Sequence, residues 1–388
     1  MLSVDEPGRP LLHADMLPAR YAGLRDQVRD FLTGELEAGS FVPRCDSWLT
    51  GFDAQFSRRV GKQGWIGATF PKQYGGAGAD AFARFVIAEE LLAAGAPVAA
   101  HWIADRQSGP SILRFGTEEQ RQRYLPGIIR GELFFAIGMS EPDAGSDLAA
   151  VRTRAERVDG GWLVNGTKVW TSHAHHAHHM LTLVRTSPAD ATRRHAGLSQ
   201  FIVDLASPGV RCNPIRLISG AHHFNEVVLD GVFVADDQVL GTVGEGWTQV
   251  THELAYERSG PERILSTFPL LEAARTTLAA TTEGRRLLAR LTAELWTLRA
   301  MSIAVAAQLQ AGHVPNVEAA TVKDLGTRFE RDLVHAVAEA LGVEPDPEAG
   351  AALPGLLADA LLQAPGFTLR GGTTEILRGI VARAVAGR

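Results

Sequence analysis

Cysteine and long apolar runs are scarce in this sequence. Its 388 residues include only two cysteines, Cys45 and Cys212, which are too few for a disulfide framework and typical of a reducing compartment. No stretch approaches the roughly 18 uninterrupted apolar residues that a membrane-spanning helix needs. The first fifteen residues contain charges and prolines where a signal peptide would have an apolar run. We therefore expect a cytoplasmic protein that does not enter a membrane.

The sequence also lacks an excess of charge of either sign. Lys and Arg number 38 against 44 Asp and Glu, which gives a formal net charge of -6. A nucleic-acid-binding protein would show a strongly basic balance, so nucleic acid is excluded as an expected partner. Hydrophobic residues make up 45% of the chain, enough for a large core, and the length favours two or three domains.

Helical spacing characterises the first region, for which we predict a domain over residues 1–133. In the run FARFVIAEELLAAG, apolar positions recur at helical spacing and Glu89 lies among them. Thr117 and Gln120 form a capping box, in which the threonine accepts from the first turn and the glutamine reaches back. This box predicts a helix that begins after Thr117 and ends near Pro126.

The second region, residues 134–240, changes to short runs rich in Val, Ile, Trp and Thr. Asn165-Gly166 predicts a two-residue hairpin turn between Trp162 and Trp170, since this pair tolerates positive φ, and Asp159-Gly160 predicts a second turn. Further strands are expected over 180–186, 199–204, 210–217 and 227–234. The pattern indicates a small antiparallel barrel or sandwich.

Helical spacing returns in the third region, residues 241–388. Two long apolar stripes run over residues 287–309 and 322–340, and such long helices suggest a bundle. The predicted fold class is α+β, with an N-terminal helical domain, a central antiparallel β-domain and a C-terminal domain resembling a four-helix bundle.

Three ordered motifs give this arrangement a family resemblance. They are FAIGMSEPDAGSD over residues 135–147, NGTKVWTS over 165–172 and GGTTEILR over 371–378. Together they resemble the signature segments of the acyl-CoA dehydrogenases, over most of residues 20–388. The resemblance implies an FAD-dependent enzyme of lipid metabolism that oxidises acyl-CoA thioesters between the α and β carbons, because FAD accepts the β-hydride while protein groups orient it.

The resemblance also implies a set of site residues. Ser140 and Ser172 would face the polar edge of the flavin, Trp170 would pack against its ring, and Ser146 would contact both cofactor and the thioester portion of the substrate. Taken alone, the two serines of the 135–147 loop would be ordinary turn residues. The full cofactor-binding set is Phe135, Ile137, Met139, Ser140, Gly145, Ser146, Trp170, Thr171, Ser172, Thr373 and Glu375.

The general base departs from the commonest family pattern. Many members have a glutamate where this chain has Gly371, whereas members such as isovaleryl-CoA dehydrogenases carry the base on the first C-terminal helix. Counting along that helix brings Glu257 to the corresponding position, so we predict Glu257 as the base, with Arg258 as a substrate-binding neighbour. Gly371 would retain a backbone N–H for the thioester carbonyl. A solvated helix pair is the alternative interpretation of Glu257 and Arg258.

A second departure concerns the adenine end of the cofactor. Many relatives carry an Arg-x-x-Phe-Gly segment that reaches across a dimer to the neighbour's FAD, and residues 275–286 show no such segment. The resemblance implies a homodimer or homotetramer, or a heteromer with a related subunit, and an electron-transfer flavoprotein as electron acceptor. Three alternatives stay open: a relative acting on acyl carrier protein thioesters, an oxygenase on the same fold, and a non-catalytic subunit that completes a partner's site.

Histidines cluster directly after the second motif. Five of them occur between His173 and His179, and such density could ligate a metal ion. No cysteine or carboxylate cluster joins them, and the family has a loop at this place. We therefore predict no metal site.

Overall fold

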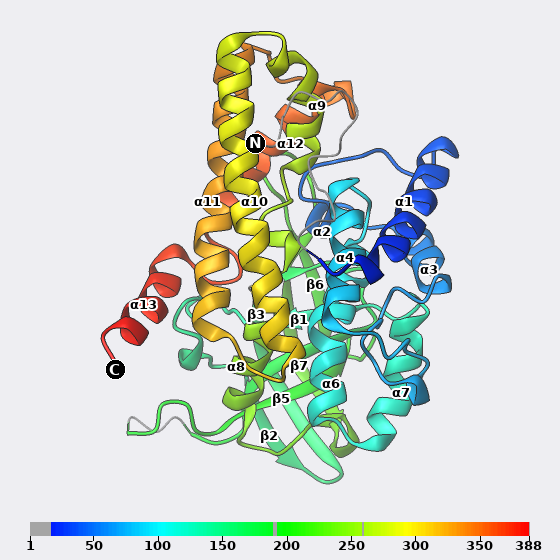
Figure 1. The fold of residues 1–388 in the computed structure, drawn as a ribbon. Coiled ribbons are helices and arrows are strands. Elements are labelled where there is room, and N and C mark those ends of the chain that lie inside the picture. Colours follow the sequence, from blue (N-terminus) through cyan, green and yellow to red (C-terminus); the bar gives the residue numbers. More distant parts are fainter. Residues whose placement is uncertain (1–16, 189–191, 258–259, 388) are drawn as a thin grey trace. The chain divides into compact units, whose positions relative to one another are not determined.

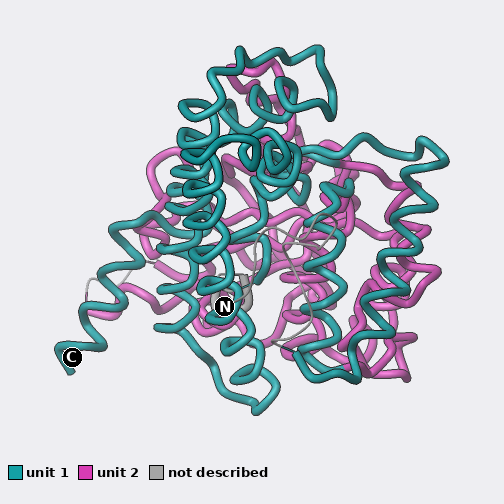
Figure 2. Tube along the Cα trace, turned by 45° about the horizontal axis from the view of Figure 1, so that its top comes forward, with its two compact units in different colours: residues 1–51, 80–97, 258–388 teal, residues 52–79, 98–257 magenta. Residues whose placement is uncertain are grey.

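The computed structural model describes residues 17–188, 192–257 and 260–387. The order of elements is helices, then strands, then helices, as the sequence predicts (Figure 1). The chain forms two compact units that are each assembled from separate segments, residues 1–51, 80–97 and 258–388 in unit 1 and residues 52–79 and 98–257 in unit 2 (Figure 2). The three-domain boundaries therefore stay a prediction.

Unit 1 consists of helices. The two longest are α10 (Thr282–Gln310) and α11 (Asn316–Leu341), which confirm the two apolar stripes and pack on each other. Their buried faces include Leu291 and Leu295 on one helix and Leu333 on the other. The remaining helices are α1 (Ala22–Glu37), α2 (Ser47–Thr50), α4 (Ala81–Ala93), α9 (Phe268–Ala279), α12 (Leu353–Phe367) and α13 (Thr374–Val385).

A buried charge network joins three helices of unit 1. Glu89 on α4 is fully buried and accepts from Arg299 on α10 and Arg25 on α1, at 2.5 and 2.7 Å. Arg25 also pairs with Glu90. A buried charge without a partner would cost several kcal/mol, so this network fixes which helices lie together. The acidic residue among the apolar positions of α4 is thus part of the core.

Unit 2 contains one eight-stranded sheet and its flanking helices. The strand order is β6-β7-β3-β2-β4-β5-β8, with β1 paired to β4. Most pairs are antiparallel, as predicted. The pairs β1–β4 and β2–β4 are parallel, which the sequence did not indicate. The strands are β1 (Phe135–Gly138), β2 (Arg154–Val158), β3 (Gly161–Ser172), β4 (His179–Arg185), β5 (Leu198–Asp204), β6 (Val210–Ile215), β7 (Phe224–Ala235) and β8 (Val239–Leu240).

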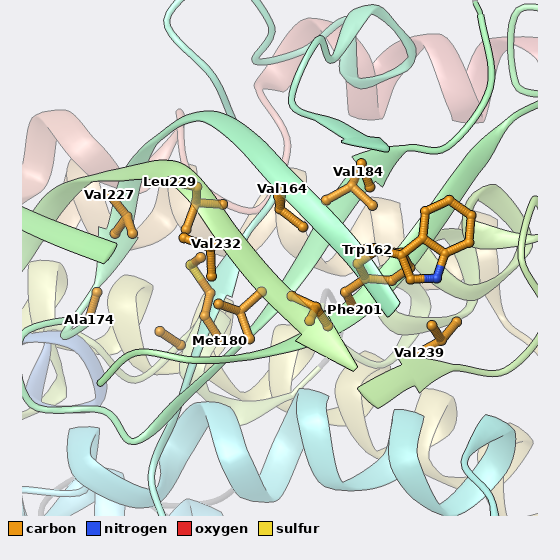
Figure 3. Close-up of a cluster of buried hydrophobic side chains, with 14 residues drawn as sticks. Trp162, Val164, Ala174, Met180, Val184, Phe201, Val227, Leu229, Val232 and Val239 are labelled. Atoms are coloured by element: carbon orange, nitrogen blue, oxygen red, sulfur yellow. The ribbon is translucent and has the colours of Figure 1, made fainter. Parts of the chain in front are cut away.

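One face of this sheet carries an apolar cluster (Figure 3). Trp162 and Phe201 meet there with ring centroids 5.5 Å apart, and Val164 and Val232 are fully buried beside them. Alternate residues of a strand point to the same face, so this cluster fixes the register of β3. The helices of unit 2 are α3 (Ala54–Lys62), α5 (Ala99–Ile103), α6 (Gly109–Phe115), α7 (Glu118–Ile129) and α8 (Gly246–Glu257).

The hairpin predicted at Asn165-Gly166 is wrong. β3 runs straight through these residues and pairs with β7 across a register shift between Val164 and Gly166. A Cβ at position 166 would come within 2.4 Å of Thr153 Oγ1, so the glycine serves a close approach of two chain segments. The predicted turn at Asp159-Gly160 is confirmed, because it joins β2 to β3 and Gly160 has a φ of 72°.

The ends of α7 illustrate one success and one error. The capping box is confirmed: Gln120 N–H donates to Thr117 Oγ1 at 3.2 Å and Thr117 N–H donates to Gln120 Oε1 at 3.0 Å. The predicted end near Pro126 is wrong, since α7 continues to Ile129. Pro126 has no N–H to donate to the carbonyl of Gln122, four residues earlier. Because Gln122 is exposed, water can bind that carbonyl instead.

Within the described residues, no helix combines the length and apolar character needed to span a bilayer.

Candidate active site

The segment that follows β1 is tied to the middle of the sheet in unit 2. Val169 N–H donates to the carbonyl of Ser140 at 2.9 Å, and Lys168 Nζ donates to the carbonyl of Met139 at 3.1 Å. Two hydrogen bonds between Glu141 and Ala144 then close a turn. Residues 139–141 are therefore held against β3 by one main-chain bond and one side chain.

A buried ion pair supports this segment. Lys168 is fully buried and its Nζ lies 2.8 Å from Glu141 Oε1. The carboxylate also accepts the N–H groups of Arg152 and Thr153, at 2.6 and 2.9 Å. Burial alone would raise the pKa of Glu141, but the Lys168 charge and these donors together lower it, so the group is an anion at neutral pH. The sequence interpretation missed this pair, although a lysine and a glutamate inside apolar strand motifs are its signal.

Trp170 leaves the regular strand geometry. A second register shift in the β3–β7 pairing falls between Lys168 and Thr171. Trp170 has a φ of 59° and is 57% exposed, and its ring meets Phe224 edge-on at 5.7 Å. Positive φ is costly for a bulky residue and is found mostly where function requires it. The bulge presents a large flat side chain that the core does not use.

The neighbouring residues offer polar groups of the kind that a flavin would take. Thr171 is fully buried, and its Oγ1 has no hydrogen-bond partner among the residues that the structure describes. Ser140, in the segment after β1, and Ser172, next to Thr171, are half-buried. A side chain without accessible surface cannot reach a bound ligand, so the Thr171 hydroxyl belongs to the interior of the bulge. An exposed indole and two partly accessible serines fit the flat face and polar edge of a flavin ring.

The other predicted cofactor residues of unit 2 differ in exposure. Phe135 is buried against Tyr124 and His179, with ring centroids 5.8 and 5.4 Å away. Ile137 and Met139, which follow at alternate positions, are half-buried. Gly145 and Ser146 lie in the exposed part of the loop.

The histidines after Ser172 form a stack of rings. His175 lies 4.0 Å from His176 and 3.9 Å from His222, measured between ring centroids. Burial, followed by repulsion from His176 and His222, lowers the pKa of His175 to about 4. Across the described parts of the chain, no group of three or more His, Cys, Asp or Glu side chains has an arrangement that could hold a metal ion.

Helix α8 carries the predicted base at its end. Its first residue, Gly246, abuts the backbone of Leu198, where a Cβ would come within 2.7 Å. One turn before its end, Glu253 Oε2 accepts from Gln200 Nε2 at 3.2 Å. α8 is therefore fixed to β5, and Glu257 is its last residue. The side chain of Glu257 and all of Arg258 lie outside the described residues.

The remaining predicted residues lie in unit 1, at the turn between α12 and α13. Gly371 and Gly372 have φ values of 68° and 99°. Thr373 caps α13, with Ile376 N–H donating to its Oγ1 at 3.4 Å. Glu375 is exposed in the first turn, where a backbone N–H lowers its pKa. The predicted site residues thus form two groups, one in each unit.

Comparisons with known proteins agree with the order of these elements. Three descriptions of one family match in sequence: "Acyl-CoA dehydrogenase, N-terminal domain" over residues 20–132, "middle domain" over 136–232 and "C-terminal domain" over 270–386. Acyl-CoA dehydrogenase IpdE1 of Mycobacterium tuberculosis is 34% identical over 382 residues, which cover 94% of this chain and 96% of IpdE1. Acyl-CoA dehydrogenase FadE34 of the same species is also 34% identical, over 84% of this chain, which spans 45% of its length.

Solved structures give the same result. A structure titled Tcur3481-Tcur3483 steroid ACAD has a TM-score of 0.85 and 29% identity, covering 98% of this chain and 99% of its own. The ChsE4-ChsE5 complex from Mycobacterium tuberculosis has a TM-score of 0.81 and 28% identity, covering 96% and 98%. These matches confirm the predicted fold class and the resemblance. The chain belongs to the acyl-CoA dehydrogenase family of flavoprotein enzymes.

Proposed function

We propose that this chain catalyses the FAD-dependent α,β-dehydrogenation of an acyl-CoA thioester. The observation that carries the proposal is the bulge in β3, which exposes Trp170 at positive φ close to the half-buried Ser172. An exposed aromatic residue at positive φ, with a serine hydroxyl close by, is suited to a flat ligand with a polar edge.

In this proposal the chain holds the cofactor through residues of unit 2. Trp170 would pack against the flavin ring, while Ser140 and Ser172 would offer hydrogen bonds to its polar edge and Thr171 would contribute through its main chain. When bound, FAD supplies the acceptor for the β-hydride of the substrate. The Glu141–Lys168 pair would keep the Ser140 segment in place against β3. Phe135, Ile137, Met139, Gly145, Thr373 and Glu375 are proposed as the rest of the cofactor site.

Four residues are proposed to handle the substrate. Glu257 removes the α-proton, and the Gly371 N–H donates to the thioester carbonyl as negative charge develops on its oxygen. Arg258 and Ser146 contact the thioester and pantetheine portions. A carboxylate desolvated by the bound acyl chain would have a pKa raised toward neutral pH, which suits a base.

The acyl group is proposed to be bulky. Gly371 stands where many relatives carry a glutamate side chain, so more room is left beside the thioester. A structural neighbour that is 29% identical is titled a steroid ACAD, which supports a polycyclic acyl-CoA as the first substrate to test. Electrons are proposed to leave through an electron-transfer flavoprotein.

The test uses the purified chain and its visible spectrum. Anaerobic addition of a steroid-CoA or a straight-chain acyl-CoA is expected to bleach the yellow flavin absorbance. Glu257→Gln should keep the colour and slow bleaching by about 100-fold or more, since general bases contribute roughly 10²–10⁴-fold. Glu245→Gln, at an exposed position just before α8, is the matched control and should bleach normally. Normal bleaching by the Glu257 variant would disprove the assignment of the base.

A second candidate is a subunit that completes a cofactor site only with a partner. Residues 275–286 lack the segment with which relatives reach a neighbour's FAD. One of the similar solved structures is a complex of ChsE4 with ChsE5. A chain that is colourless alone and turns yellow when co-expressed with a related subunit would favour this candidate over the self-sufficient enzyme.

A further inference from the structure

The turn between α12 and α13 has little rigidity of its own. Gly371 and Gly372 are consecutive glycines with φ values of 68° and 99°. Glycine adopts this region without steric cost, but it also leaves it more easily than any other residue. In the part of the chain that the structure describes, the Gly371 N–H donates to no protein acceptor. Its direction must therefore be set by neighbouring groups.

Lys323 on α11 is the first of these groups. It is fully buried, and its Nζ donates to the carbonyls of Gly372 and Phe367 at 2.7 and 3.4 Å. Hydrogen bonds from an ammonium are roughly twice as strong as neutral ones. Phe367 is the last residue of α12, so the lysine connects the end of that helix to the turn.

The helix that carries Lys323 is itself fixed at this point. One turn further along, Gly326 approaches the backbone so closely that a Cβ would lie 2.2 Å from the carbonyl of Arg263. The neighbouring Asp324 accepts from Arg378 on α13 at 3.3 Å. Consecutive residues of α11 therefore hold the two sides of the turn.

Arg370 provides the second anchor, directly before Gly371. Its two terminal nitrogens donate to the two carboxylate oxygens of Asp46, at 2.6 and 2.5 Å. Asp46 is fully buried, and the guanidinium also lies over the ring of Trp48 at 4.7 Å. A bidentate pair fixes orientation as well as distance. Gly371 is thus flanked by two residues whose positions are set by buried charged contacts.

We propose that Lys323 and the Asp46–Arg370 pair are positioning residues that aim the Gly371 N–H at the thioester carbonyl. The inference rests on the proposed function, in which that N–H is the donor. None of the three side chains touches the substrate in this role. They act by restricting the glycine turn, so that the donor is in place before the carbonyl oxygen gains charge.

The central experiment is hydrogen–deuterium exchange on the FAD-loaded protein without substrate. The amides of Arg370 and Thr374 are hydrogen-bonded, to Gly366 and Thr368, and report on the order of the turn. Lys323→Met should raise their exchange rate by about tenfold, whereas Lys323→Arg, which keeps the cation, should raise it less. In turnover, Lys323→Met should lower kcat by about 10- to 100-fold with little change in KM.

Leu333→Ala is the matched control for general loss of stability. Leu333 is buried on the same helix, ten residues further on, and removing its side chain weakens α11 without touching the turn. Equal exchange at the turn in Leu333→Ala and Lys323→Met, or no change in the latter, would overturn the proposal. If Lys323→Met does not fold, Arg370→Lys is measured in the same way and must raise exchange at the turn.

The positioning role and the proposed function can be refuted independently of each other. If no acyl-CoA reduces the wild-type flavin, the proposed function fails, while the exchange data still show whether Lys323 orders the turn. If the wild type turns over and Lys323→Met has an ordered turn or an unchanged kcat, only the positioning role is refuted.

Discussion

The Ser140 segment of unit 2 and the Gly371 turn of unit 1 are both held by a fully buried lysine, but the surroundings of the two differ. Lys168 supports a segment that already has a main-chain bond to a strand, whereas Lys323 supports two glycines between helices. The first lysine is part of the sheet's structure, and the second binds a glycine turn that is also held by the Asp46–Arg370 pair. The same residue type therefore serves global stability in one unit and local order in the other.

The two units also differ in the pKa shifts of their buried ionisable groups. In unit 1, burial raises the pKa of Glu330 to about 8 and that of Asp359 to about 6. In unit 2, burial lowers the pKa of His101 to about 4, although Ser57 Oγ lies 2.8 Å from its ring. Burial thus favours the neutral form of these particular groups, two acids in unit 1 and a histidine in unit 2.

The largest expected effect comes from breaking the Lys168 contact. Lys168→Met leaves Glu141 buried beside apolar atoms with only main-chain donors, so the free energy of unfolding should fall by about 3–5 kcal/mol in a urea titration. The double variant Lys168→Met/Glu141→Gln should recover part of this loss, because the stranded charge is gone. If the free energy of unfolding falls by less than about 1 kcal/mol, or if only local hydrogen exchange changes, the two lysines would not differ in their roles.

Opposite pH dependence of two variants would sharpen the comparison. Glu330 has a raised pKa, so its contribution to stability is fully present below about 4.5 and is lost as the pH rises through about 8. His101 has a lowered pKa, so its contribution is present above 6.5 and is lost as the pH falls toward 4. The two groups should therefore weaken the folded state at opposite ends of the pH range.

Urea unfolding at pH 5, 7 and 9 measures this effect. Relative to wild type, Glu330→Gln should gain about 2–4 kcal/mol between pH 5 and pH 9, and His101→Gln should gain about 2 kcal/mol between pH 7 and pH 5. Parallel pH profiles for the two variants would contradict the assignment of opposite behaviour to the two units.

The smallest effect concerns the helix caps. Thr117 makes a reciprocal capping box at the start of α7 in unit 2, whereas Thr373 makes one bond of 3.4 Å at the start of α13 in unit 1. Thr117→Ala should cost about 1 kcal/mol and Thr373→Ala less, with Thr→Ser restoring most of each loss. A larger cost for Thr373→Ala would mean that the cap, and not Lys323, orders the glycine turn.

Local patterns in the sequence predicted the elements well. Helical spacing predicted α10 and α11, short runs rich in β-branched and aromatic residues predicted β4, β5 and β7, and the capping box set the start of α7. These features depend on residues near one another in the chain, where periodicity is informative. The family resemblance and the fold class, which rest on the order of several motifs, are also confirmed.

Features that depend on distant residues could not be predicted. Asn165-Gly166 has the composition of a hairpin, yet pairing with β7 and the approach of Thr153 make it a bulge. The positive φ of Trp170 follows from the same pairing. Gly371 was identified by motif, but Asp46 lies over 300 residues away in the chain and nothing local marks it as a partner of Arg370. The roles of Glu257 and the other site residues stay predictions.

The division into interleaved segments also sets an order in time. All parts of unit 2 have been synthesised once residue 257 leaves the ribosome, whereas unit 1 needs residues from both ends of the chain. Until α10 emerges, Glu89 has no Arg299 to pair with, and the α1–α4 pair carries an incomplete charge network. In a nascent chain the sheet of unit 2 can therefore be complete while α1 and α4 still lack α10. These unpartnered helices are where a chaperone would be needed most.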